Sequence, residues 1–162
     1  MRRPQLGPAV ARTILARALL ALAALTFGGC STLGGATPAP TPQDFPGIAD
    51  QLALQGLTVG QPRSGDPGCS DSTLAPTAIA FDLSGLGVTS PIRARVFLFA
   101  DDAAYQRRRA DVDTCTAAWA TDPANVEFID ESPFVLVIQG PIPAPFKAAV
   151  VRALTTASGR GG

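Results

Sequence analysis

The sequence predicts an α+β domain in which an antiparallel sheet of four to five strands packs against about three helices. Three observations lead to this fold class. Residues 77–83 and 92–99 alternate apolar with more polar side chains, as half-buried antiparallel strands do. Residues 146–154 carry apolar side chains at helical spacing. Two cysteines, Cys69 and Cys115, stand in the same stretch, so one disulfide is expected to cross-link it.

Three helices are expected along this stretch. The first has a short apolar face and ends before Gly56, since glycine commonly terminates a helix. The second begins at Asp101 or Asp102, whose carboxylates suit a helix N-terminus. The third begins near Pro145, which fits a first helical turn, and it ends before Gly159.

Strands are expected at 77–83, 92–99 and 134–139, with weaker ones near 57–60 and 126–129. Within 92–99 the alternation assigns Arg95 and Phe97 to the wetter face of the strand. The segment 134–138 is apolar at every position, which favours a central strand covered on both faces. The predicted order is helix, three strands, helix, two strands, helix. Such an order is typical of helices packed against one sheet.

The cysteine pair is interpreted as a structural disulfide. Outside the cytoplasm, an even pair of cysteines in a small domain usually forms one. Closing the loop from Cys69 to Cys115 is expected to stabilise the fold by about 4 kcal/mol. A reactive thiol pair is the alternative, but the sequence has neither a CxxC motif nor a histidine. A structural zinc site needs four ligands, and two cysteines do not supply them.

The N-terminus has the organisation of a secretory signal peptide. Four arginines lie within residues 1–17, residues 18–27 form an apolar run, and Gly28 and Gly29 follow. Ten apolar residues span about 15 Å as a helix, roughly half of a bilayer core. The sequence therefore predicts that residues 1–29 are a cleaved signal peptide rather than a permanent transmembrane anchor.

The end of this signal, Phe27-Gly28-Gly29-Cys30, resembles the lipobox of bacterial lipoproteins. The usual pattern has Leu where this chain has Phe27. The resemblance implies that Cys30 receives a diacylglycerol and that signal peptidase II cleaves before it, so the expected partners are the membrane and the lipoprotein-processing enzymes. An ordinary cleaved signal followed by an unrelated cysteine is the alternative. Because Ser31 is not Asp, the resemblance implies the outer membrane in a two-membrane bacterium, and otherwise the outer face of the plasma membrane.

Four segments are predicted on this basis. Residues 1–29 are the lipoprotein signal peptide, and residues 30–44 are a lipidated cysteine with a flexible tether rich in Pro, Gly and Thr. Residues 45–158 form a single domain, and residues 159–162 a disordered tail. An extended segment packed on the domain is the alternative to a free tether.

Composition argues against several classes of function. The four arginines before Cys30 leave nine basic residues against 13 acidic ones, a net charge of −4 for the rest of the chain. This acidic balance does not suit nucleic-acid binding. The chain has no histidine, which excludes active sites with a histidine base or a His-containing triad and zinc sites with histidine ligands. No cofactor and no metal site are expected.

Two sets of residues are candidates for a functional site. Asp101 and Asp102 are able to bind a cation or act in acid–base chemistry, although capping of a helix is the favoured interpretation. Four aromatic side chains form a possible ligand or partner surface, with core packing as the favoured alternative. They are Phe97, Phe99, Tyr105 and Trp119.

A run of three arginines gives a third candidate. Arg107 and Arg109 each lie four residues before an aspartate, Asp111 or Asp113. On a helix such pairs neutralise one another at the surface, so a solvated ion-paired face is favoured over a phosphate site.

The stretch from 97 to 141, with FADDAAYQRRRADVDTC and SPFVLVIQGP, resembles small secreted lipoproteins of bacteria. The resemblance implies a class of protein and no mechanism. The favoured hypothesis is a membrane-anchored envelope lipoprotein whose non-enzymatic domain binds a protein or a small molecule. A small extracytoplasmic enzyme using Asp101 and Asp102, or a purely structural envelope component, are the alternatives.

Overall fold

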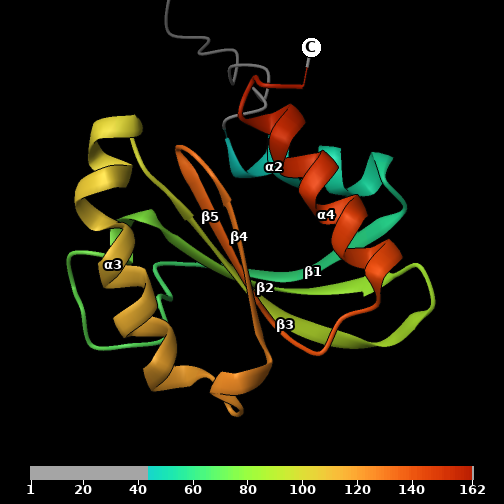
Figure 1. The fold of residues 1–162 in the computed structure, drawn as a ribbon, viewed down its shortest axis with the longest axis horizontal. Helices are drawn as coiled ribbons and strands as arrows, with labels where there is room; N and C mark the ends of the chain where they lie inside the picture. Colours follow the sequence, from blue (N-terminus) through green and yellow to red (C-terminus); the bar gives the residue numbers. More distant parts are fainter. Residues whose placement is uncertain (1–43, 162) are drawn as a thin grey trace, which may run out of the picture. The chain divides into compact units, whose positions relative to one another are not determined.

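The computed structural model describes residues 44–161, and the predicted signal peptide, Cys30 and nearly all of the tether lie outside these residues. Figure 1 shows a single sheet between two layers of helix. The elements in chain order are α2 (Phe45–Leu54), β1 (Leu57–Ser64), the 3-10 turn η1 (Ala75–Thr77), β2 (Ala78–Gly85), β3 (Val88–Leu98), α3 (Asp102–Trp119), the 3-10 turn η2 (Pro123–Asn125), β4 (Val126–Glu131), β5 (Phe134–Gln139) and α4 (Ala144–Ala157).

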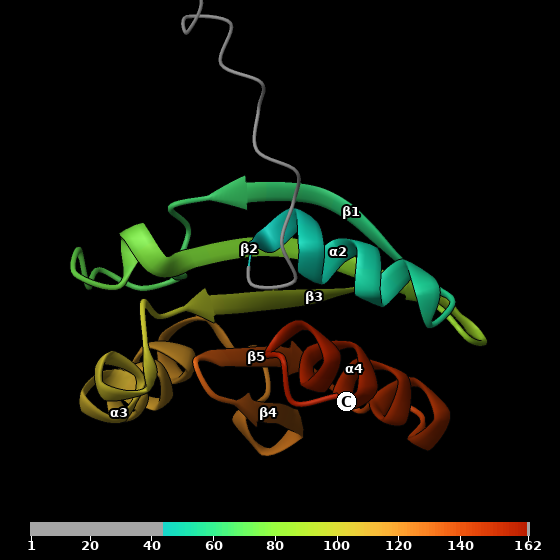
Figure 2. The same ribbon diagram turned by 90° about the horizontal axis from the view of Figure 1, so that it is seen from above.

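The five strands form one antiparallel sheet in the order β1-β2-β3-β5-β4. The α+β class, the antiparallel sheet and the order of elements along the chain are therefore confirmed. The last hairpin enters the sheet with β5 beside β3, so β4 becomes an edge strand, as Figure 2 shows.

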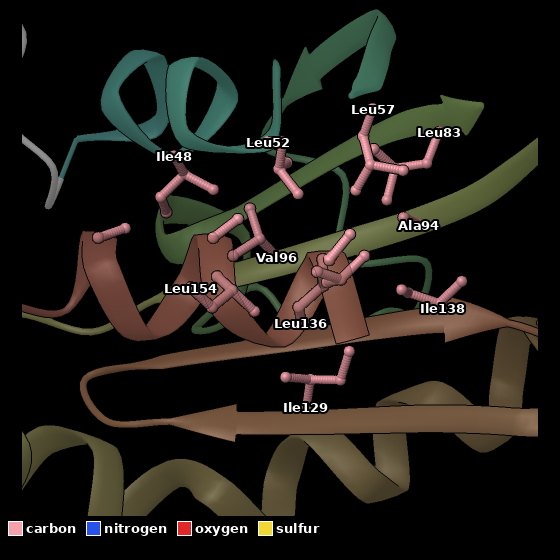
Figure 3. Packing of buried hydrophobic residues seen from close by; sticks show 14 of the residues in the cluster. Ile48, Leu52, Leu57, Leu83, Ala94, Val96, Ile129, Leu136, Ile138 and Leu154 are labelled. Carbon is pink, nitrogen blue, oxygen red and sulfur yellow. The ribbon is translucent and has the colours of Figure 1, made fainter. Parts of the chain in front are cut away.

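Helices α2 and α4 cover one face of the sheet and form the larger core with it. Ile48 and Leu52 of α2 meet the apolar face of α4, including Leu154, over Val96 and Leu136 of the central strands (Figure 3). All five side chains are fully buried. The apolar residues whose spacing predicted the C-terminal helix thus form the face of α4 that packs on the sheet.

Helix α3 and the loop between β1 and η1 cover the opposite face. Val135 and Val137 of β5 point into this second core, while Phe134, Leu136 and Ile138 point into the first. The prediction of a central strand buried on both faces is confirmed, since an apolar side chain at every position needs cover on both sides.

Strand β3 differs from the sequence prediction in one respect. Arg95 and Phe97 were assigned to a wetter face, but both are buried beneath α3 and the loop. Alternation alone does not reveal this cover, because residues far away in the sequence provide it.

The turns follow the local chemistry of the chain. Gly56 has a φ of +80° directly after α2, as a helix-terminating glycine does. Gly85 has a φ of +114°, and a Cβ there would lie 2.5 Å from the carbonyl oxygen of Gly56. Glycine at this position therefore allows the β2–β3 hairpin to pass close to the end of α2.

The chain after α4 folds back onto the helix over residues 159–161. The Arg160 amide donates to the Thr155 carbonyl at 3.1 Å, and the Gly159 amide donates to that of Thr156 at 3.1 Å. A left-handed glycine, with φ +77° at Gly159, turns the chain back so that these bonds form.

Replacement of Leu154 by Ala should lower the free energy of unfolding by about 2–5 kcal/mol, because it opens a cavity in the larger core. Leu54, at the end of α2, is 75% exposed, and Leu54→Ala is the matched control. The control should change the same quantity by less than about 0.5 kcal/mol. Urea denaturation followed by circular dichroism measures both, and similar losses for the two variants would contradict the packing described.

Candidate functional site

The Cys69–Cys115 disulfide joins the loop after β1 to the C-terminal part of α3. The two Cα atoms lie 5.3 Å apart, which is an ordinary disulfide separation. The predicted pairing is therefore confirmed. Cys115 is buried in the second core, and its Sγ lies 3.1 Å from the carbonyl oxygen of Pro67 in the loop.

A buried arginine lies beside this cross-link. Arg95, from the centre of β3, is only 6% exposed. Its Nη2 donates to Asp66 Oδ1 at 3.2 Å, and its Nε donates to the Asp66 carbonyl oxygen at 3.2 Å. Its guanidinium carbon lies 4.2 Å from the centre of the Trp119 ring of α3. A buried charge needs such partners, because burial removes it from water.

The loop passes directly over Arg95 and Trp119 at Gly68. This residue has a φ of +83°, and a Cβ there would lie 2.6 Å from Trp119 Cδ1 and 2.7 Å from the Arg95 guanidinium carbon. The close approach therefore requires glycine for its conformation and for its small size. We refer to Asp66, Gly68, Arg95, Trp119 and the disulfide as the disulfide corner.

The pKa of Asp66 is lowered within this corner. Burial on its own raises the pKa of this carboxyl, but the hydrogen bond and the charge of Arg95 outweigh burial, with a smaller contribution from Arg63. Asp66 is therefore held as the carboxylate that compensates the buried guanidinium.

The four aromatic residues considered as a ligand surface lie mostly in the second core. Phe97, Phe99 and Tyr105 are buried, and Trp119 is partly buried against them. The rings of Phe99 and Tyr105 meet edge to face, with centroids 6.1 Å apart. Core packing, the alternative interpretation, therefore describes their placement.

Asp101 and Asp102 line a cleft of about 470 Å³ at the N-terminus of α3, together with Phe99, Ser132 and Arg160. Asp101 is the N-cap, and its Oδ1 accepts from the Ala104 amide at 2.7 Å. The carboxylate of Asp102 accepts a hydrogen bond from Ser132 Oγ and lies 3.6 Å from a guanidinium nitrogen of Arg160. Both carboxylates are thus engaged in capping or pairing.

The arginine run on α3 is largely neutralised by neighbouring acids. Arg109 pairs with Asp113, as predicted, and also with Asp130 of β4. The predicted pair of Arg107 with Asp111 was wrong, because Arg108, one residue on, pairs with Asp111.

Tyr105 joins the same cluster. Its hydroxyl donates to Asp130 Oδ1 at 3.0 Å, and burial followed by this negative neighbour raises the pKa of its phenol. Asp130 therefore receives hydrogen bonds from both Arg109 and Tyr105. This cluster ties α3 to β4, and its two carboxylates outnumber its single guanidinium.

Residues 44–161 contain neither a membrane-spanning helix nor a cluster of metal ligands. None of the helices there has both the length and the apolar character needed to cross a bilayer. Within the same residues, no three Asp, Glu, Cys or His side chains converge as metal ligands. No family model, curated protein or solved structure matches the chain.

Sequence reasoning singled out the two cysteines and Trp119 of the disulfide corner but missed its other residues. Arg95 was assigned to a strand face, and Asp66 and Gly68 were not singled out. A Gly beside a cysteine, in a loop between two strands, was the available signal. It does not reveal which buried groups the loop covers.

Gly68→Ala should lower the free energy of unfolding by more than Gly65→Ala does. Both glycines have a positive φ, of +83° and +78°, so both variants incur about 1–2 kcal/mol of backbone strain. Only Gly68 has the crowding by Trp119 and Arg95, since a Cβ at Gly65 meets nothing within 4 Å. Trp119 is the single tryptophan, so its emission should shift only in Gly68→Ala. Equal destabilisation with unchanged emission would argue against the close approach.

The contribution of Asp66 should depend on pH with a defined sign. Because its folded pKa is lowered, this contribution is present above the unfolded pKa of about 4 and is lost as pH falls through the folded pKa. The difference in unfolding free energy between the wild type and Asp66→Asn should therefore shrink between about pH 5 and pH 2. In an Arg95→Met background most of this pH dependence should disappear. A difference that stays constant with pH in the wild-type background would contradict the assignment.

Proposed function

We propose that this chain is a lipid-anchored extracytoplasmic protein whose α+β domain binds a protein or small-molecule partner without catalysing a reaction. The Cys69–Cys115 disulfide is the observation that carries the proposal. Cytosolic thiols are kept reduced, whereas disulfides form and persist in secreted and periplasmic proteins. The basic and apolar N-terminus ending at Cys30 supports the same address.

Binding is proposed rather than catalysis because of the state of the acidic residues. Asp101 caps α3, and the Asp102 carboxylate accepts a hydrogen bond from Ser132 and pairs with Arg160. A carboxylate pair that acts as acid and base needs groups free to exchange protons with a substrate. The disulfide and the Arg95–Asp66 ion pair also hold the cover of the second core in place, which favours a rigid surface for recognition.

A lipid anchor is proposed at Cys30 on the evidence of the lipobox resemblance. Two or more acyl chains hold a protein stably at a membrane, while one chain holds it only marginally. Residues 30–44 would then connect the lipid to α2, which begins at Phe45.

Metabolic labelling with a clickable fatty acid tests this proposal. The wild type should be labelled, and Cys30→Ala should lose the label because the acceptor sulfur is gone. Ser31→Ala, one residue away, is the matched control and should keep it. Labelling of Cys30→Ala at the wild-type level would contradict the proposed lipid anchor at Cys30. Proteolytic digestion of the envelope fraction without reduction should yield the two peptides that contain Cys69 and Cys115 still joined by their disulfide. Free thiols at both positions would contradict the proposed extracytoplasmic location.

A further inference from the structure

The two edges of the sheet differ in their ability to accept another strand. Edge strand β1 contains Pro62, and its register with β2 breaks between Gly60 and Arg63. Proline lacks an N–H donor, and such irregularities discourage further pairing. Edge strand β4 has no proline and keeps an unbroken register with β5 from Val126 to Glu131.

The outer backbone groups of β4 follow from its pairing with β5. The Gly140 amide donates to the Asn125 carbonyl, which sets the hydrogen-bonded positions of the ladder. In an antiparallel ladder these positions alternate, so Val126, Phe128 and Asp130 direct their N–H and C=O groups away from β5. No strand within residues 44–161 lies beyond β4 (Figure 2).

A hollow of about 190 Å³ lies beside this edge, between β4 and the end of α3. Its walls are mainly apolar and are formed by Asp113, Thr116, Ala117, Ala120, Pro123, Val126 and Phe128. Val126 and Phe128 are two residues apart on β4, so their side chains share the face that α3 covers. The hollow has room for one side chain of moderate size.

We propose that β4 binds an extended peptide of a partner protein, which adds to the sheet as a sixth strand. Backbone hydrogen bonds to Val126, Phe128 and Asp130 supply affinity, and an apolar side chain of the peptide enters the hollow. This inference rests on the proposed binding function and assigns it a site and a class of partner.

The charges around the edge determine which peptide fits. Glu127, Asp130 and Glu131 lie on β4, and Asp113 lies at the rim of the hollow. Lys147 pairs with Glu127, and Arg109 with Asp130 and Asp113, so acids outnumber bases in this region. Basic residues beside the apolar one are therefore favoured in the partner.

The same charges disfavour a second copy of this chain as the occupant. Pairing of β4 with β4 would bring the carboxylates of Glu127, Asp130 and Glu131 from two copies onto one short ladder. Like charges placed opposite one another destabilise paired strands.

Selection from a displayed library of random peptides on the full-length chain tests the proposal. The expected consensus is an apolar residue flanked by Lys or Arg in a segment without proline. Ala117 is exposed on α3 and lines the hollow, so Ala117→Phe should fill it and raise the Kd of a selected peptide by at least about tenfold. Ala110, also exposed on α3 but lining none of the clefts described, gives the matched control, and Ala110→Phe should leave the Kd within about twofold.

Amide hydrogen exchange measured by NMR on the complex provides a second readout. The outward amides of Phe128 and Asp130 should gain protection, while Glu127 and Ile129, already paired with β5, should change little. A library without enrichment, equal effects of the two Ala→Phe variants, or protection that arises from dimers without peptide would each overturn the proposal. Fatty-acid labelling at Cys30 is independent of Ala117, so failure here is distinguishable from failure of the lipid anchor.

Discussion

The fold depends on the burial of both faces of β5. Five successive apolar side chains in an extended strand point alternately to opposite sides, so each side needs its own cover. Helices α2 and α4 supply this cover on one side, and α3 with the β1–η1 loop supplies it on the other. The place of β5 inside the sheet, with β4 at the edge, follows from the same requirement, because an edge position would expose part of the strand.

The two cores are stabilised in different ways. The α2–α4 side is made almost entirely of aliphatic and Phe side chains, and burial of apolar surface is sufficient to explain it. The α3 side contains a charged guanidinium within its cover. Here the ion pair with Asp66, the Trp119 ring and the disulfide act on the same few residues. The loop is thereby held in place although it has little regular secondary structure.

Under the proposed peptide binding, the braced parts of the domain and the binding edge are made of different residues. In the disulfide corner Arg95 pairs with Asp66 and lies over the Trp119 ring, although Arg95 Nη1 and Trp119 Nε1 are buried without a hydrogen-bond partner. The cleft at Asp101 and Asp102 is lined by groups that cap or pair. Strand β4 differs because half of its backbone hydrogen-bonding groups face away from the sheet. Bracing of α3 by the disulfide and by the contacts of Arg109 and Tyr105 with Asp130 also fixes the wall of the hollow beside β4. A preformed groove of this kind binds at a lower entropic cost than a flexible one.

The sequence by itself determined the class of fold, the order of the elements and the cysteine pair. The elements follow from local periodicity and from glycine and proline at their ends, which act over short distances along the chain. The cysteine pair follows from the count alone, because only two cysteines remain after Cys30. The tertiary structure alone decided that Arg95 and Phe97 are buried, that Asp66 compensates the arginine, that Arg108 rather than Arg107 meets Asp111, and that β4 forms an open edge. The physical reason is that each depends on which distant segment covers a given face, and neither the spacing nor the residue types of one segment contain that information.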